Sequence, residues 1–115
     1  MMPKLEDITM NLESFEFQQK IVEEVFGQNI WQVPSPEKTA AFQRAFSYIA
    51  ERYQIVLWQR FGLKKSRLKI GKELRNLKTN EIGISQERVR QIEVRALRGL
   101  RHPRSSKFLK AERDI

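Results

Sequence analysis

The chain contains no cysteine and a single histidine, His102, which stands just before Pro103. Without cysteine it has neither disulfides nor thiolate ligands for a metal. A glycine-rich phosphate-binding loop is also missing, because the five glycines are scattered along the chain. A histidine next to a proline is most simply a residue at a helix end. We therefore expect a protein that is not an enzyme, with no metal site and no cofactor.

Long apolar runs are missing as well. The longest run, Ile55 to Trp58, is far shorter than the roughly 20 apolar residues that cross a bilayer. The first 35 residues are acidic, which is not the character of a signal peptide. These absences predict a cytoplasmic protein with no membrane partner.

Acidic residues are scarce in the larger part of the chain. Residues 1–35 hold two lysines and six acidic residues, whereas residues 36–115 hold 20 basic and eight acidic ones. The formal net charge of the whole chain is +8. A basic surface of this kind favours a polyanionic partner such as nucleic acid.

Strand signals are nearly absent, and the apolar residues recur at helical spacing. At 115 residues the chain suits one small domain, so we predict an all-α fold, a small helical bundle. Serine caps, an early proline and glycine stops mark the helix ends. The helices are expected at about 14–26, from Ser35–Pro36 onward, 51–61, 66–77 and 85–103. In the fourth, we expect Leu68, Ile70, Leu74 and Leu77 to be available for the core.

The predicted organisation has three parts. Residues 1–34 form an acidic amino-terminal helix and linker, 35–109 the main domain, and 110–115 a basic tail. Pro103 is expected to stop the last helix. The residues after it either fray or continue briefly as helix through Phe108 and Leu109.

The most informative stretch runs from Gly83 to Pro103. Its apolar residues fall on one helical face and its polar residues on the other, and four arginines accompany a single acid, Glu93, between Val89 and Pro103. A solvated amphipathic helix would mix lysines and glutamates, whereas arginine suits guanine and phosphate. The residues expected to face outward are Gln86, Glu87, Arg90, Gln91, Val94, Arg95 and Arg98. A preceding helix and a glycine-containing turn complete the pattern of a helix-turn-helix DNA-binding domain.

Residues 85–93 and 96–103 closely resemble region 4.2 of bacterial sigma-70 family RNA polymerase sigma factors. Residues 51–63 are similar to region 4.1 of the same family, and Ile70-Gly71-Lys72 looks like the centre of the first helix of its helix-turn-helix. The resemblance implies a fold of the sigma region 4 type. It also implies binding to the minus 35 promoter element, in double-stranded DNA, and to the beta flap of the RNA polymerase core.

The resemblance also implies which residues meet DNA. The start of the recognition helix faces bases or nearby phosphates, two upstream arginines touch the backbone, and two later arginines lie near DNA or meet activators. The residues at the start of the recognition helix are Ser85, Gln86, Glu87, Arg88, Arg90 and Gln91. The two upstream arginines are Arg52 and Arg60, and the two later ones are Arg95 and Arg98. For Arg52 and Arg60 the alternative is a surface ion pair with a neighbouring acid.

The sequence departs from the family pattern in two places. Position 86 is glutamine where the family commonly has arginine, so the preferred DNA site is expected to differ from the usual one. Extra residues also stand between Arg75 and Ile82, ahead of the recognition helix. The basic residues there, together with Lys72, either touch phosphate or lie in an exposed loop without contacts.

Several alternatives stay open at this point. Nothing in residues 1–49 resembles the sigma region that melts promoters, which favours a second sigma-like or regulatory polypeptide as partner. The protein then either helps to initiate transcription or occupies the beta flap and redirects polymerase. Its acidic amino-terminal helix either docks such a partner or covers part of the core. The competing interpretation is a homodimeric helix-turn-helix transcriptional repressor that does not bind polymerase.

Overall fold

The computed structural model describes residues 9–114, and all regular structure in that range is helical apart from one isolated antiparallel bridge between Arg75 and Ile82. The elements are α1 (Phe15–Phe26), α2 (Pro36–Phe46), α3 (Glu51–Leu57), the π-helical turn η2 (Trp58–Gly62), α4 (Arg67–Glu73), α5 (Gln86–Arg101) and α6 (Pro103–Ala111). The expected all-α fold is confirmed.

Serine side chains set the beginnings of four helices. The hydroxyls of Ser14, Ser35, Ser66 and Ser85 each accept a hydrogen bond from the backbone N–H three residues later, at 3.1 to 3.3 Å. Each bond satisfies an N–H that has no partner inside the helix. This is why the predicted starts of α1, α2, α4 and α5 agree with the observed ones.

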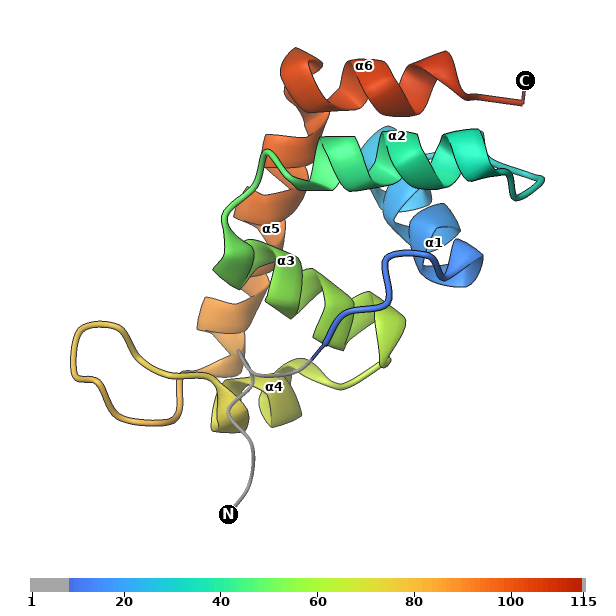
Figure 1. Ribbon diagram of the computed structural model, residues 1–115. Helices are drawn as coiled ribbons and strands as arrows, with labels where there is room; N and C mark the ends of the chain where they lie inside the picture. The colour runs from blue at the N-terminus through green and yellow to red at the C-terminus, as the bar shows by residue number, and fades with distance from the viewer. Residues whose placement is uncertain (1–8, 115) are drawn as a thin grey trace.

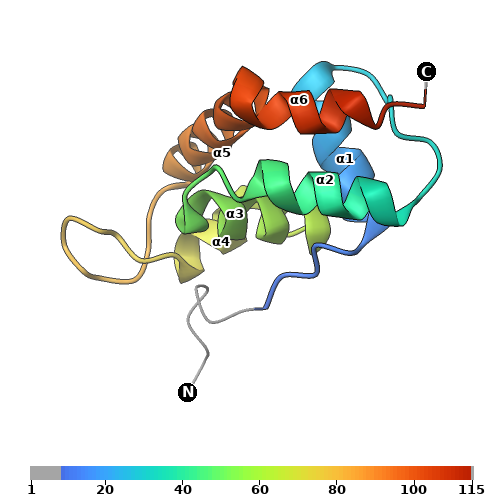
Figure 2. The same cartoon turned by 45° about the horizontal axis from the view of Figure 1, so that its top comes forward.

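The helices form two layers joined by α5. In Figures 1 and 2, α2 and α6 lie side by side and antiparallel at one end of the molecule, while α3 and α4 lie toward the other end. Helix α5 packs against α1, α3, α4 and α6. It therefore runs through the molecule and contributes to both layers (Figure 1).

Two clusters of buried side chains make the core. The larger cluster joins α1, α2 and α6 to the second half of α5, and Phe17 lies near its centre, edge-on to Phe42, Phe46 and Trp58 at centroid distances of 5.6, 5.9 and 4.9 Å. Such edge-to-face contacts add to the burial of the rings. The apolar face of α1 thus covers part of the core, which is one of the two roles that the sequence suggested for this helix.

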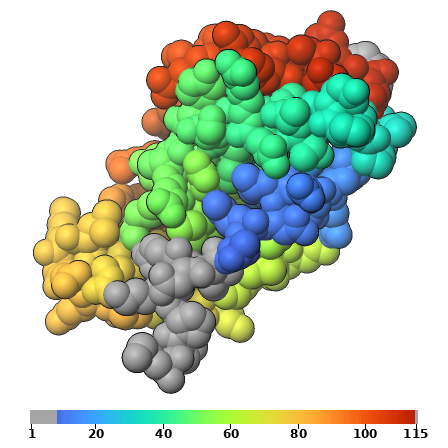
Figure 3. Space-filling view, viewed as in Figure 1, coloured from blue at the N-terminus to red at the C-terminus, as the bar shows by residue number. Residues whose placement is uncertain are grey.

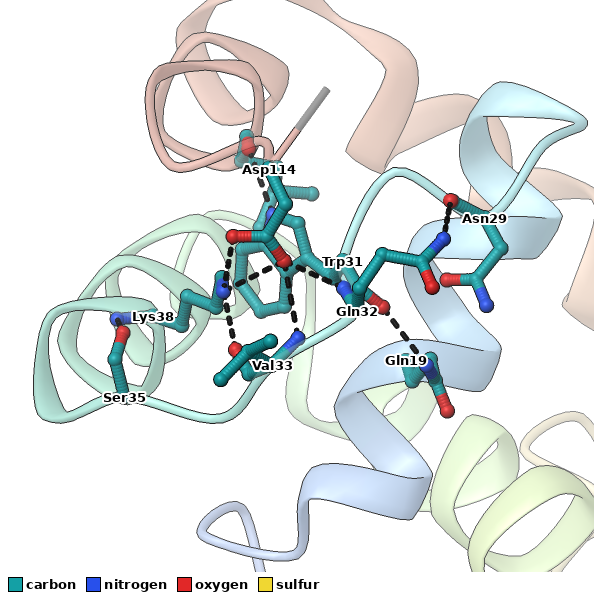
Figure 4. Close-up of polar contacts among 9 residues, drawn as sticks. Gln19, Asn29, Trp31, Gln32, Val33, Ser35, Lys38 and Asp114 are labelled. Atoms are coloured by element: carbon teal, nitrogen blue, oxygen red, sulfur yellow. Dashed lines mark hydrogen bonds and ion pairs between the residues drawn. The ribbon is translucent and has the colours of Figure 1, made fainter.

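A set of polar contacts, which we call the Asp114 clasp, joins the carboxyl-terminal end of the described chain to the linker before α2 and to the first turn of α2 (Figure 4). The Asp114 carboxylate accepts from the backbone N–H groups of Gln32 and Val33 at 2.6 and 3.0 Å, and from the Lys38 ammonium at 2.7 Å. These donors lower the pKa of Asp114 from 3.8 to about 2. The buried Trp31 indole donates to the Leu109 carbonyl at 3.0 Å, which fastens the linker to α6.

The end of α5 agrees with the expectation, whereas the end of α4 does not. Helix α5 stops at Arg101, just before Pro103, and Pro103 then opens α6, where proline at the first position costs no hydrogen bond. Residues 103–111 are therefore a packed helix, with Leu109 only 1% exposed. The helix predicted at 66–77 ends at Glu73, because Leu74 takes an extended conformation to enter the core. The chain then leaves the core as a loop, so Leu77 is 72% exposed, and Leu68 is also exposed.

Candidate nucleic-acid interface

The smaller core cluster holds the first turns of α5 in place. It contains Ile55 and Val56 from α3, Ile70 from α4, Leu74 just after α4, and Val89 and Ile92 from α5. Gly71 allows a close backbone approach, since a Cβ there would lie 2.4 Å from the Ile84 carbonyl oxygen. The Ile84 N–H donates to the Gly71 carbonyl at 2.7 Å. Helices α4 and α5 therefore form a helix-turn-helix with α3 behind it.

The outer face of α5 is open. Side chains at steps of four, three and four residues form one stripe along it, which we call the reading stripe: Glu87, Gln91, Val94 and Arg98. All four are exposed, as are the other residues predicted to face outward. The stripe combines a carboxylate, an amide and a guanidinium, groups that hydrogen-bond to base edges in the major groove.

Neighbouring side chains orient the start of this stripe. The Arg90 guanidinium holds the Glu87 carboxylate in a two-point contact, which lowers the pKa of Glu87 and raises that of Arg90. One turn along, the Arg88 guanidinium donates to the Gln91 side-chain oxygen at 3.1 Å. At the helix end, Ser85 serves as the cap and Gln86 is exposed beside it.

One edge of the reading stripe is basic and hollowed. Arg88 and Arg95 project from α5 on this edge, near Arg52 from α3 and Lys78 from the preceding loop. Together with neighbouring residues they line a hollow of about 620 Å³. The Arg52 guanidinium also donates to the Arg75 carbonyl at 2.6 Å, so it supports the base of the loop.

The other edge is organised around a buried carboxylate. Glu93 is 3% exposed and its two oxygens face the guanidinium groups of Arg60 at 3.3 Å and Arg67 at 3.0 Å. Arg60 thus forms an ion pair, as its alternative interpretation expected, but with a buried acid rather than one at the surface, and its contact with DNA stays a prediction. The Arg67 partnership was missed, because no local pattern links residues 26 positions apart.

The extra residues ahead of α5 form an ordered, protruding loop. In Figures 1 and 3 it stands out from the body of the protein as the gold segment. Arg75 and Ile82 bridge its base, and the Gly83 N–H donates to the Leu74 carbonyl at 2.7 Å. The extra residues therefore form an extended loop and do not lengthen α4.

The described part of the chain contains neither a candidate metal site nor a helix that could span a membrane. Between residues 9 and 114, no three His, Asp or Glu side chains are grouped so that they could hold a metal ion. No helix in the same range is long and apolar enough to span a bilayer.

Comparison with known proteins adds the family. The family described as "Sigma-70, region 4" matches residues 79–102, which include the end of the loop and nearly all of α5. The RNA polymerase sigma factor SigA of Clostridium acetobutylicum is 37% identical over 86 residues, covering 69% of this chain and 22% of that protein. A SigA from a Bacillus species is 45% identical over 62 residues, covering 54% of this chain and 15% of that protein.

The chain thus spans about a fifth or less of the length of these curated relatives. No solved structure matches it. Region 4 modules are DNA-binding parts of transcription initiation factors and are not enzymes, in agreement with the expectation drawn from composition. The family match, the two relatives and the helix-turn-helix geometry together show that this chain belongs to the sigma-70 region 4 family.

Proposed function

We propose that the protein binds the minus 35 element of promoter DNA by placing α5 in the major groove, and thereby directs or modulates the initiation of transcription. The observation that carries the proposal is the reading stripe: polar side chains stand exposed on a helix whose opposite face is locked into two core clusters. A reading helix must be rigid and its contacts exposed, because base-edge hydrogen bonds demand fixed positions.

Each side chain at the helix start has a suitable task. Glu87 accepts from the amino group of cytosine, and Gln91 faces adenine or a thymine methyl. Arg88 and Arg90 reach phosphates or a guanine, while Ser85 and Gln86 lie at the end that enters the groove first. Because Gln86 replaces the arginine common in the family, the preferred sequence differs there from the usual element.

The proposed protein partner is RNA polymerase, through the flap of its beta subunit. The support is the family match together with the names of the two relatives, both of which are RNA polymerase sigma factors. A second sigma-like or regulatory protein is a further proposed partner, as the sequence favoured.

Selection from a library of random duplexes tests DNA recognition. The wild-type protein should enrich one sequence, and Gln91→Ala should relax the preference at a single base pair. Gln43→Ala is the matched control, because Gln43 is an exposed glutamine on α2, in the other layer. Enrichment of no sequence, or the same preference in all three proteins, would contradict the assignment of α5 as the reading helix.

Binding to polymerase needs its own test. The tagged protein should retain purified core polymerase and an isolated beta-flap fragment, and a pull-down from host lysate should bring polymerase and any companion protein with it. A protein that ignores both polymerase probes, and binds palindromic duplexes as a dimer, would instead be the helix-turn-helix repressor.

A further inference from the structure

The loop between α4 and α5 has a defined shape of its own. The Asn76 N–H donates to the Glu81 carbonyl at 2.7 Å, and the Arg75 guanidinium donates to the carbonyl and side-chain oxygens of Asn80 at 2.8 and 2.9 Å. Asn80 adopts a left-handed conformation with φ of 62° at the turn. A loop closed by its own hydrogen bonds holds its tip at a fixed place, which is typical of functional surface loops.

The tip of this loop presents Leu77 and Lys78 to solvent. Leu77 is 72% exposed and Lys78 is exposed beside it. In the region from 9 to 114, the Lys78 ammonium takes part in no ion pair or hydrogen bond. The lysine charge is therefore available to a ligand.

The hollow of about 620 Å³ separates this tip from α5. Among residues 9–114, its lining brings the cations Lys78, Arg88 and Arg95 together with the apolar side chains of Leu77 and Ile84, and no acidic residue of that range lines it. A concentration of positive charge of this kind favours a polyanion. Apolar side chains among them suit the sugars that alternate with phosphates in a nucleic-acid backbone better than they suit a free anion.

We infer that this hollow holds the sugar–phosphate backbone of the DNA strand that passes along the Arg88 edge of α5, so that the loop makes a second DNA contact outside the reading stripe. The inference rests on the proposed function. It adds to that function a contact made by Lys78, which lies just before the residues that the family match covers.

The geometry of a helix in the major groove supports this inference. An α-helix is about 10–12 Å across and the groove about 12 Å wide, so the backbones run along both edges of the helix. Arg88 and Arg95 are seven residues apart and share one of these edges. A backbone on that edge runs beside the hollow between α5 and the loop, which Lys78 lines together with the two arginines.

The test measures the salt dependence of binding to the duplex that the wild-type protein enriches. Lys78→Ala should reduce the log–log slope by about 0.9, the value for one phosphate contact. The advantage of the wild type over the variant should therefore shrink about 3.5-fold between 50 and 200 mM salt. Lys78→Arg should restore the slope, and Lys20→Ala, an exposed lysine on α1, should leave it unchanged.

Uncharged methylphosphonate linkages, introduced one at a time into the duplex, then locate the contact. One position should weaken the wild type but have no further effect on Lys78→Ala. If the wild type binds its duplex while Lys78→Ala keeps the same slope and the same response to every linkage, the second contact is wrong and the proposed function stands. If the wild type enriches no duplex at all, both are overturned.

Discussion

The Arg90 guanidinium holds the Glu87 carboxylate at two points, with Nε 3.0 Å from Oε2 and Nη2 2.6 Å from Oε1. The contact keeps Glu87 ionised, since the pKa of its carboxyl is lowered, and an ionised carboxylate can only accept hydrogen bonds. Glu87 is therefore presented as a fixed acceptor one turn into α5.

Glu87→Ala and Arg90→Ala should each relax recognition of the DNA element without unfolding the domain. Losing one good base contact lowers discrimination at that base pair by about tenfold to a hundredfold. Competition binding with single-base variants of the enriched duplex measures this loss, and thermal unfolding should be nearly unchanged. Glu23→Ala, at an exposed acid of α1, is the control. An unchanged DNA preference in both test variants would remove these residues from the interface.

Ile92→Asp should unfold the domain. Ile92 is 3% exposed in the smaller cluster, and an unpaired carboxylate there costs several kcal/mol, comparable to the stability of a small domain. Circular dichroism should show loss of helix at 25 °C. The matched control is Val94→Asp, two residues along the same helix but 37% exposed, which should stay folded. A folded Ile92→Asp protein would contradict the core assignment.

Glu93→Gln should lower the free energy of unfolding by about 2 kcal/mol. The substitution leaves two guanidinium groups without their charge partner, but Arg60 and Arg67 are each about a third exposed on their side chains, so water offsets part of the loss. Urea unfolding measures the change. Glu73→Gln provides a comparison, because the Glu73 carboxylate is more exposed than that of Glu93 and its salt bridge is with one cation, Lys65, so it should contribute less. Equal decreases in the free energy of unfolding for the two variants would show that the burial of Glu93 adds nothing to the strength of its ion pairs.

Asp114→Asn should remove a pH-dependent part of the stability. Because folding lowers the pKa of Asp114 to about 2 from its ordinary 3.8, the clasp stabilises fully above about pH 4. That contribution is lost as the pH falls through 2. The difference in Tm between wild type and variant should thus be constant from pH 7 to pH 5 and narrow toward pH 2. A difference that stays the same at every pH would mean that the Asp114 charge contributes nothing.

The helices could be predicted largely because their signals are local. Ser14, Ser35, Ser66 and Ser85 each cap a helix through a bond that reaches only three residues. The outward residues of α5 follow from the same short-range geometry.

The features that the sequence did not predict are those that depend on tertiary contacts. Leu74 is drawn into the core and ends α4 early, so helical spacing wrongly extended that helix to Leu77. The partnership of Arg67 with Glu93, and the hollow between Lys78 and Arg88, depend on residues brought together only by folding.

Helix α5 is shared between the two clusters: Val89 and Ile92 lie in the smaller one, and Ala96, Leu97 and Leu100 in the larger one. Its 16 residues make a helix about 24 Å long, and a core cluster packs against each half of it. At the far end the Arg101 guanidinium also binds the carbonyls of Val25 and Glu24 in the last turn of α1. A ligand that tilts the first turns of α5 must therefore tilt the whole helix and strain the packing of α1, α2 and α6. Helix α5 therefore couples the surface around Glu87 mechanically to the surface formed by α1, α2 and α6.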